Sequence, residues 1–179
     1  MTAMEIVTYP NEVLTTPAQP VEAVDGAIVR LMDAMAETMY LSQGVGLAAP
    51  QVGVGRRVLT MDVGDGETKG GFGLVHLANP ELVEGTGEVI WDEGCLSFPG
   101  LTVSVKRYER VVVKALNREG KEVTLEAGGL AAICLQHEID HLDGIVFVNR
   151  LKGLRRRLAL REYMKLVREG AGTGHMPLS

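Results

Sequence analysis

The residues with the clearest chemistry are His137-Glu138-Ile139-Asp140-His141, an H-E-x-x-H pattern in a segment that we expect to be helical. Side chains four apart on a helix lie on one face, so the two histidines can bind one ion with Glu138 beside it. By chance the pattern would occur in roughly one chain of this composition in a hundred. Burying these ionisable groups in one helical turn is costly unless a cation pairs with them. The pattern therefore predicts a metal site with a carboxylate placed for acid–base chemistry.

A catalytic ion usually has three protein ligands and one open position, so a third ligand must come from elsewhere. Glu162 follows His141 by 21 residues, as in zinc peptidases of the two-His, one-Glu kind, but its neighbours are basic and favour a surface ion pair. Cys134 shares the helical stripe of the histidines but lies about 10 Å along the axis from His141. Cys95 lies in a turn-rich segment that could bring its thiol to the helix. The residue types alone leave these three candidates open.

Three segments have the apolar spacing of helices. Apolar residues three and four apart predict a helix over residues 25–43 and a last helix over residues 151–168. Residues 130–142, which carry the histidine motif, have little polarity outside a few positions, so we expect that helix to be buried. The last helix would gather on one side the apolar residues Leu151, Leu154, Leu158 and Met164 or Leu166.

The region between these helices has the pattern of β-strands. Short runs rich in β-branched residues are separated by turn signals, and Asn117–Gly120 has the composition of a hairpin loop. Because the connections are short, antiparallel or mixed sheets are favoured over a βαβ fold. The predicted strands cover residues 58–62, 74–79, 82–90, 102–106, 111–117 and 121–125.

The composition is that of an ordinary globular protein, with 46% hydrophobic and 23% charged residues among 179. Aromatic residues make up only 4%, which does not favour a stacking surface for nucleic acid, so we expect no DNA partner. The apolar runs are too short to span a bilayer, and no basic residue precedes Arg30, so we expect no secretory signal or transit peptide. Two cysteines cannot build a disulfide framework, which indicates a reducing cytoplasm. We expect one domain over residues 1–170 and a disordered tail over residues 171–179.

The charge is distributed unevenly along the chain. Residues 149–170 hold eight basic and two acidic residues, although the whole chain has a net charge of −5. A basic terminal helix on an acidic body suggests a polyanionic partner, whereas a solvated helical face would have the same composition. Both interpretations stay open at the level of sequence.

Three segments together resemble the peptide deformylase family. They are Gly44–Gln51 (GVGLAAPQ), Glu93–Ser97 (EGCLS) and Gln136–Gly144 (QHEIDHLDG), and they occur in the order that the family has. The resemblance covers about residues 4–168. Each motif alone is weak, because any helix-to-strand connection can resemble the first one, but the three together are specific.

The resemblance implies an α+β fold, with antiparallel or mixed sheets around a buried central helix that carries the metal motif, and a C-terminal helix. It implies a hydrolase that removes the formyl group from the N-terminal formyl-methionine of nascent polypeptides and releases formate. It also makes Cys95, His137 and His141 the metal ligands and Glu138 the general acid and base. One divalent ion per chain is implied, Fe(II) in the cell, with zinc, nickel or cobalt as possible ions in purified protein.

Further roles follow from the same resemblance. Gln51 and the backbone N–H of Leu96 would donate hydrogen bonds to the developing oxyanion. Bacterial members often carry an arginine seven residues after the ligand cysteine, where this chain has Thr102, so contacts beyond the methionine are expected to differ. Arg107 is a candidate partner of Glu93, although an exposed strand arginine would have the same pattern.

The substrate would be bound by apolar and backbone contacts. Val45, Ile133 and the stem of His137 are candidates for the pocket of the methionine side chain, with core packing as the alternative for Ile133. The backbones of Val45, Gly46 and Gly94 would pair with the peptide beyond the methionine, as an added strand does.

The expected partners are N-formyl-methionyl nascent peptides, with a ribosome contact through the basic terminal helix. We expect a bacterial cytoplasmic location and leave an organellar origin open. Two other functions stay in competition: a zinc peptidase with Glu162 as third ligand, and a closed structural metal site of both cysteines and both histidines. Glu138 argues against the closed site, because a structural ion has no use for an acid–base group.

Overall fold

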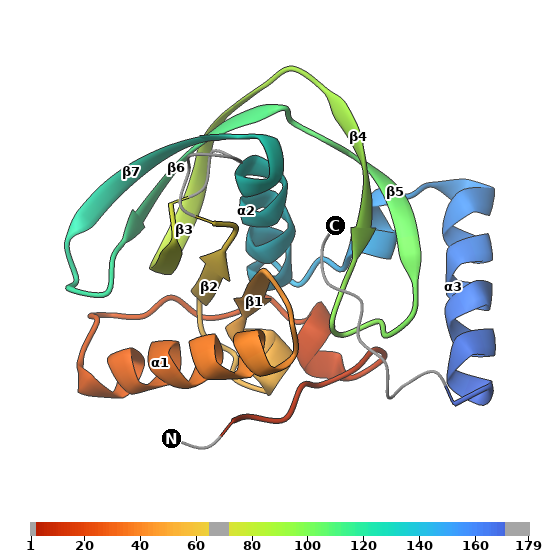
Figure 1. Ribbon diagram of the computed structural model, residues 1–179, viewed down its shortest axis with the longest axis horizontal. Coiled ribbons are helices and arrows are strands. Elements are labelled where there is room, and N and C mark those ends of the chain that lie inside the picture. Colours follow the sequence, from red (N-terminus) through yellow and green to blue (C-terminus); the bar gives the residue numbers. More distant parts are fainter. Residues whose placement is uncertain (1–2, 65–71, 171–179) are drawn as a thin grey trace.

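The computed structural model describes residues 3–64 and 72–170, and the tail predicted over residues 171–179 lies outside the described residues. The described chain has an α+β fold built from three helices and two antiparallel sheets (Figure 1). Within these residues, no helix combines the length and apolarity that a membrane span requires.

The larger sheet has five strands in the order β1-β2-β3-β6-β7, and every neighbouring pair is antiparallel. β2 occupies the residues predicted for it, and the turn between β6 and β7 is the hairpin predicted over residues 117–120. β1, at one edge of the sheet, was not predicted as a strand. The bounds are β1 (Gly46–Ala48), β2 (Val58–Asp62), β3 (Leu74–Thr86), β6 (Arg110–Leu116) and β7 (Glu122–Gly128).

The smaller sheet pairs β4 (Val89–Gly94) with β5 (Thr102–Arg107) and continues the ladder of the larger one. The β3–β6 ladder ends at Thr86 and Arg110, and the β4–β5 ladder starts a few residues further on. Gly87, between β3 and β4, has φ of 70°, which glycine adopts without strain. The ribbon therefore bends here and arches over the middle of the molecule (Figure 1).

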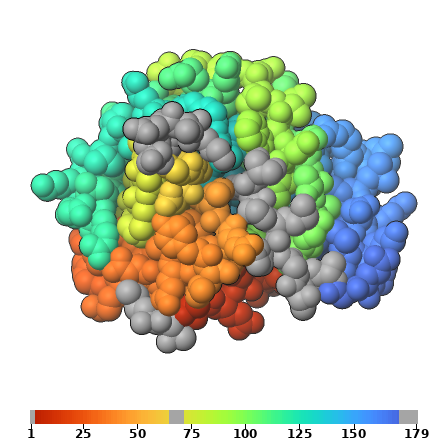
Figure 2. All heavy atoms as spheres, in the orientation of Figure 1, coloured from red at the N-terminus to blue at the C-terminus, as the bar shows by residue number. Residues whose placement is uncertain are grey.

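Three helices complete the fold. α1 (Gly26–Leu41) is capped by the Asp25 side chain, which accepts from the N–H of Ile28, and its buried methionines pack beneath β1 and β2. α2 (Gly129–Leu142) lies between the two sheets and is buried over all residues from 131 to 142. α3 (Gly153–Arg168) runs along the outside of β4 and β5 (Figures 1 and 2). Short 3₁₀ helices cover residues 12–15, 49–52 (η2) and 147–150 (η3).

Two expectations about elements were wrong, the second of them in part. The strands predicted over residues 74–79 and 82–90 are largely one strand, β3, in which register shifts accommodate the interruption at Asn79 and Pro80. The predicted apolar side of the last helix is only partly packed: Leu151 is buried and Leu166 is partly buried, but Leu154 and Leu158 are 62% and 49% exposed. The buried residues of α3 are Ala159 and Tyr163. The Tyr163 hydroxyl donates to the backbone oxygen of Tyr9 at 3.0 Å, which fixes that face inward.

Candidate metal centre

One cluster of metal-ligating side chains lies in the interior of the described residues. It consists of Cys95, His137 and His141, which are all buried and whose ligand atoms lie within 4.8 Å of one another. The two histidines come from α2, one turn apart, and Cys95 lies in the loop that follows β4. The β4–β5 ribbon thus places the thiol of Cys95 beside α2, although Cys95 and His137 are 42 residues apart in the sequence.

The spacing of the donor atoms suits one tetrahedral ion. Nε2 of His141 lies 3.3 Å from Nε2 of His137 and 3.4 Å from Sγ of Cys95. Two nitrogens bound to one tetrahedral ion are expected about 3.3 Å apart. Burial lowers the pKa of His141 well below its usual value, which favours the neutral ring that a metal ligand requires. The donor set therefore fits a divalent transition-metal ion.

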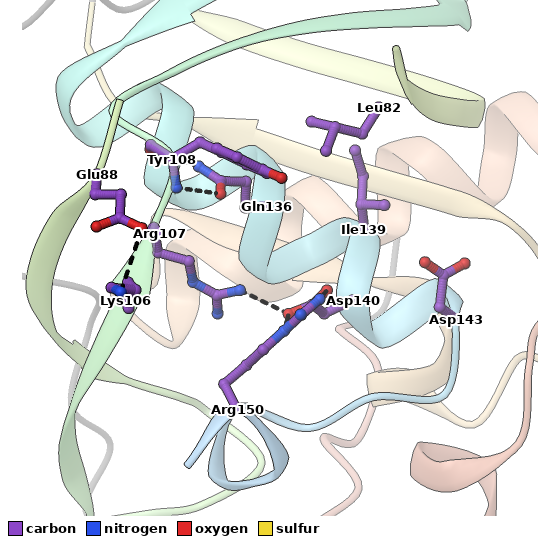
Figure 3. A pocket seen from close by; sticks show the side chains of 10 residues that line it. All are labelled: Leu82, Glu88, Lys106, Arg107, Tyr108, Gln136, Ile139, Asp140, Asp143 and Arg150. Atoms are coloured by element: carbon purple, nitrogen blue, oxygen red, sulfur yellow. Dashed lines mark hydrogen bonds and ion pairs between the residues drawn. The ribbon is translucent and has the colours of Figure 1, made fainter. Parts of the chain in front are cut away.

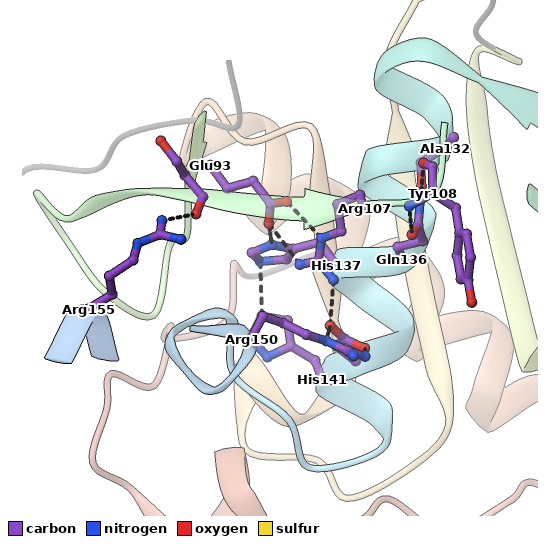
Figure 4. Close-up of polar contacts among 11 residues, drawn as sticks. Glu93, Arg107, Tyr108, Ala132, Gln136, His137, His141, Arg150 and Arg155 are labelled. Carbon is purple, nitrogen blue, oxygen red and sulfur yellow. Dashed lines mark hydrogen bonds and ion pairs between the residues drawn. The ribbon is translucent and has the colours of Figure 1, made fainter. Parts of the chain in front are cut away.

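The ring of His137 is oriented by Glu93 on β4. Nδ1 of His137 donates to Oε1 of Glu93 at 2.8 Å, which leaves Nε2 of the same ring facing the cluster. Arg107 on β5 donates to both Glu93 oxygens, at 2.7 and 2.9 Å, so the predicted pairing of these two residues is confirmed (Figure 4). Burial alone would raise the pKa of Glu93, but hydrogen bonds from Arg107 and His137 outweigh it and lower the pKa to about 2.

The same network includes two residues to which the sequence analysis gave no role. Asp140, inside the histidine motif, accepts from Nη1 of Arg107 at 2.6 Å. Arg150 at the end of η3 binds both oxygens of that carboxylate, at 2.9 and 2.5 Å. Asp140 is 5% exposed. An aspartate within a helix that is predicted to be buried is the sequence signal that could have indicated a cationic partner for it.

Glu138 faces the cluster from the same helix and is 1% exposed. Among the described residues its Oε2 has no hydrogen-bond partner. Burial raises the pKa of Glu138 to about 7, in the range that suits a group that both accepts and donates a proton. Together with Cys95, His137 and Gln51, it lines a narrow cavity that ends at the cluster.

Gln51 in η2 is held with its amide toward the thiol. Its Oε1 accepts from the N–H of Ala48 at 3.0 Å, which leaves its NH₂ group 3.7 Å from Sγ of Cys95 and 3.2 Å from the hydroxyl of Ser97. The carbonyl oxygen is thereby engaged, and the NH₂ is the part of the side chain that faces the cavity. Leu96 lines the same cavity.

The edge strand β1 presents its free side to this cavity. The carbonyl of Val45 accepts from the N–H of Asp62 at 2.9 Å, so it is already used within the sheet. Backbone groups alternate in direction along an antiparallel strand, so the N–H and C=O of Gly46 point away from β2. Gly94 lies across the cavity and pairs with Thr102 on β5.

The other predicted site residues lie apart from the cavity. Ile133 is 1% exposed on α2, one turn before His137, and is not among the residues that line the cavity. Cys134 is buried with its Sγ 3.6 Å from the carbonyl oxygen of Val45, and it is not part of the ligand cluster. Glu162 is exposed on α3 and lines a different groove. A site with Glu162 or Cys134 as third ligand is therefore not formed in this structure.

Comparisons with known proteins agree with one another. The sequence profile of the polypeptide deformylase family matches residues 3–157. A peptide deformylase of Aquifex aeolicus (strain VF5) is 49% identical over 164 residues, which cover 92% of this chain and 96% of that protein. The crystal structure of a peptide deformylase from Legionella pneumophila superposes with a TM-score of 0.85 at 43% identity and covers 95% of this chain and 98% of that one. A peptide deformylase from Ehrlichia chaffeensis in complex with actinonin gives a TM-score of 0.85 at 40% identity, with 92% and 98% covered.

Proposed function

This chain belongs to the peptide deformylase family, and on that premise we propose that Cys95, His137 and His141 bind its metal ion. As a member of the family, it is a hydrolase that removes the formyl group from the N-terminal formyl-methionine of nascent polypeptides and releases formate. The observation that carries the proposal is the convergence of three buried ligand atoms within 4.8 Å. We assign the catalytic domain to residues 1–170, with the motif-bearing α2 as its central helix.

Glu138 is the general base and then the general acid. A divalent ion bound at the cluster would supply Lewis acidity, which lowers the pKa of a bound water and polarises a carbonyl. The unpartnered Oε2 of Glu138 accepts the proton of the water that attacks the formyl carbon. The same carboxyl then gives the proton to the departing amine, so formate and the free N-terminus leave together.

Two hydrogen-bond donors stabilise the negative charge on the formyl oxygen. The NH₂ group of Gln51 is one, because its carbonyl end is already bound to Ala48. The backbone N–H of Leu96, next to the ligand cysteine, is the other. A donor that is in position before the reaction contributes roughly 3 kcal/mol to the stability of such a transition state.

Substrate selection combines a narrow reaction site with backbone pairing. A formyl carbon carries only hydrogen, so the confined space at the cluster would exclude an acetyl group by steric overlap. The peptide beyond the methionine pairs with the free edge of β1 at Gly46 and with Gly94 opposite, which suits many sequences. Val45 and the stem of His137, which line the cavity, would contact the methionine side chain, and Ile133, which does not line it, is left as a residue of the core.

We propose Fe(II) as the ion in the cell, although zinc, nickel or cobalt can occupy a Cys/His/His site in purified protein. Most ligand sets bind zinc more tightly than Fe(II), so the supply of each ion and its oxidation decide which one is loaded. A reducing bacterial cytoplasm would keep both the Cys95 thiol and the ion reduced. Elemental analysis of anaerobically purified protein identifies the ion directly.

We also propose that α3 contacts the ribosome, where nascent peptides emerge. It carries exposed cationic side chains, among them Arg157, Arg161 and Lys165, together with the exposed Leu154 and Leu158. Cations spaced along one helix face suit the phosphates of RNA.

An end-product assay tests the function. With an N-formyl-methionyl tripeptide we expect one formate per free amine and no internal cleavage, and with the N-acetyl analogue we expect no product. New internal peptide ends would instead support a zinc peptidase. Removal of the ion with a chelator should abolish formate release, and adding back Fe(II), nickel or cobalt should restore it.

A further inference from the structure

We infer that Arg150 is a positioning residue of the metal centre: it holds Asp140, and through Arg107 and Glu93 it fixes the ring of His137. Arg150 lies in η3, beyond the histidine motif, and the family roles described above do not include it. The inference rests on the proposed function, because it takes His137 as a ligand.

A continuous chain of hydrogen bonds joins Arg150 to the ligand. The Arg150 guanidinium binds Asp140 through two nitrogens, at 2.9 and 2.5 Å. Asp140 accepts from Nη1 of Arg107 at 2.6 Å, and Arg107 uses its other two nitrogens to bind Glu93 at 2.7 and 2.9 Å. Glu93 then accepts from the His137 ring at 2.8 Å. Figures 3 and 4 show this chain of contacts running from η3 to α2 and β5.

The charges explain why Arg150 is needed. The side chains of Arg107, Glu93 and Asp140 are 3%, 0% and 7% exposed, so one buried cation lies between two buried anions. Without Arg150 this group carries an uncompensated negative charge, which is costly in a buried setting. Arg150 balances that charge from the more open side, where its own side chain is 44% exposed.

Asp140 and Glu93 compete for the hydrogen-bond donors of Arg107. Arg107 binds Glu93 through two nitrogens because Asp140 accepts from only the third one. Arg107, Asp140 and Arg150 line one cavity of about 320 Å³, which water can enter (Figure 3). When Arg150 is shortened, Asp140 is left to be satisfied by Arg107 and water, so the grip of Arg107 on Glu93 and the orientation of His137 loosen.

Arg57 offers a matched control at the same end of α2. It donates to the carbonyl of Leu142 and to the carboxylate of Asp143, both at 2.9 Å. It is therefore an arginine that anchors the C-terminal end of this helix, as Arg150 does. Within residues 3–64 and 72–170, no hydrogen bond of Arg57 leads to Arg107 or Glu93, so its loss should lower stability without reaching the ligand.

The test uses cobalt(II)-loaded protein and follows the absorption spectrum of the ion while a chelator removes it. We expect Arg150→Gln to shift the cobalt bands and to lose cobalt about tenfold faster than the wild type. Arg57→Gln should keep both the spectrum and the release rate. Arg150→Lys keeps the charge but not the two-nitrogen contact with Asp140, so its rate of cobalt release should lie between those of Arg150→Gln and the wild type. This variant tests the inference if Arg150→Gln does not fold.

A Glu93→Gln background decides whether the effect travels through Glu93. There Arg150→Gln should add little to the release rate. Release at the wild-type rate in Arg150→Gln, equal acceleration by Arg57→Gln, or an unchanged effect in the Glu93→Gln background would each overturn the inference. If the wild type itself holds no cobalt, or if Cys95→Ser holds it as tightly, the proposed metal centre fails instead, so the two failures are distinguishable.

Discussion

Gly46 and Glu138 approach so closely that no side chain fits between them: a Cβ at position 46 would lie 2.8 Å from Oε1 of Glu138. The same Cβ would lie 2.7 Å from Sγ of Cys134. The edge strand β1 can therefore lie against α2 only because residue 46 is a glycine. This contact places the free backbone edge of β1 beside the carboxylate that we assign as the acid–base group.

Gly46→Ala should reduce activity more than it reduces metal binding. The added methyl must displace the Glu138 carboxylate, the Cys134 thiol or the strand, at a cost of about 1–3 kcal/mol. We expect kcat/KM to fall at least tenfold while the metal content stays near one ion per chain. Gly55→Ala is the control, because a Cβ there meets nothing within 4 Å. Equal activity of the two variants would refute the role of this contact.

Glu138→Gln should retain the ion and lose turnover. The amide keeps the size of the side chain but cannot accept the proton of the attacking water. We expect kcat to fall by about 10²- to 10⁴-fold, measured as formate released per bound ion. Glu162→Gln is the matched control on the exposed face of α3 and should be as active as the wild type. Near-normal turnover of Glu138→Gln would exclude the general-base assignment.

The two cysteines should respond differently to serine. Cys95→Ser removes the sulfur of the cluster, so we expect the ion to be weakened or exchanged, as dialysis followed by elemental analysis would report. Cys134→Ser changes a buried thiol that faces the Val45 carbonyl, and we expect this variant to bind metal normally. The reverse pattern would mean that the third ligand has been assigned to the wrong sulfur.

Exposed charges on α3 should govern ribosome association and leave the chemistry unchanged. Replacing Arg157, Arg161 and Lys165 by glutamine removes three cations without touching the packed residue Tyr163. We expect weaker, less salt-dependent cosedimentation with ribosomes, and unchanged formate release from a short formyl peptide. The control is the same number of lysine and arginine replacements elsewhere, at Arg30, Arg56 and Lys121. Undiminished cosedimentation would make the basic face an ordinary solvated surface.

Local patterns predicted most of the elements. The short β-type run at residues 58–62 and the turn residues at 117–120 predict β2 and the β6–β7 hairpin from neighbouring residues alone. The packed side of α3 could not be read in this way, because a small residue, Ala159, and an aromatic one, Tyr163, face the core while Leu154 and Leu158 remain exposed. Which side of an amphipathic helix packs is decided by the partner surface.

The residues of the site also divide into those that local spacing predicts and those that only the fold brings together. The i, i+4 spacing of His137 and His141 predicts two ligands, because a helix fixes their relative positions. The proximity of Cys95 depends on the bend at Gly87 and on the length of the β4–β5 ribbon, so only the resemblance to a family could indicate it. The roles of Asp140 and Arg150 could not be predicted from the sequence. Both depend on Arg107 of β5, which binds Asp140 although the two lie 33 residues apart, and Arg150 reads as one more cation of a basic segment until its contact with Asp140 is known.

X-ray absorption at the metal edge of reduced, metal-loaded protein tests the central claim most directly. One sulfur at about 2.3 Å and two imidazole nitrogens at about 2.0–2.1 Å from the ion would match the Cys95, His137 and His141 assignment. The sulfur signal should disappear in Cys95→Ser and persist in Cys134→Ser. A wild-type ion with no sulfur neighbour would contradict the account.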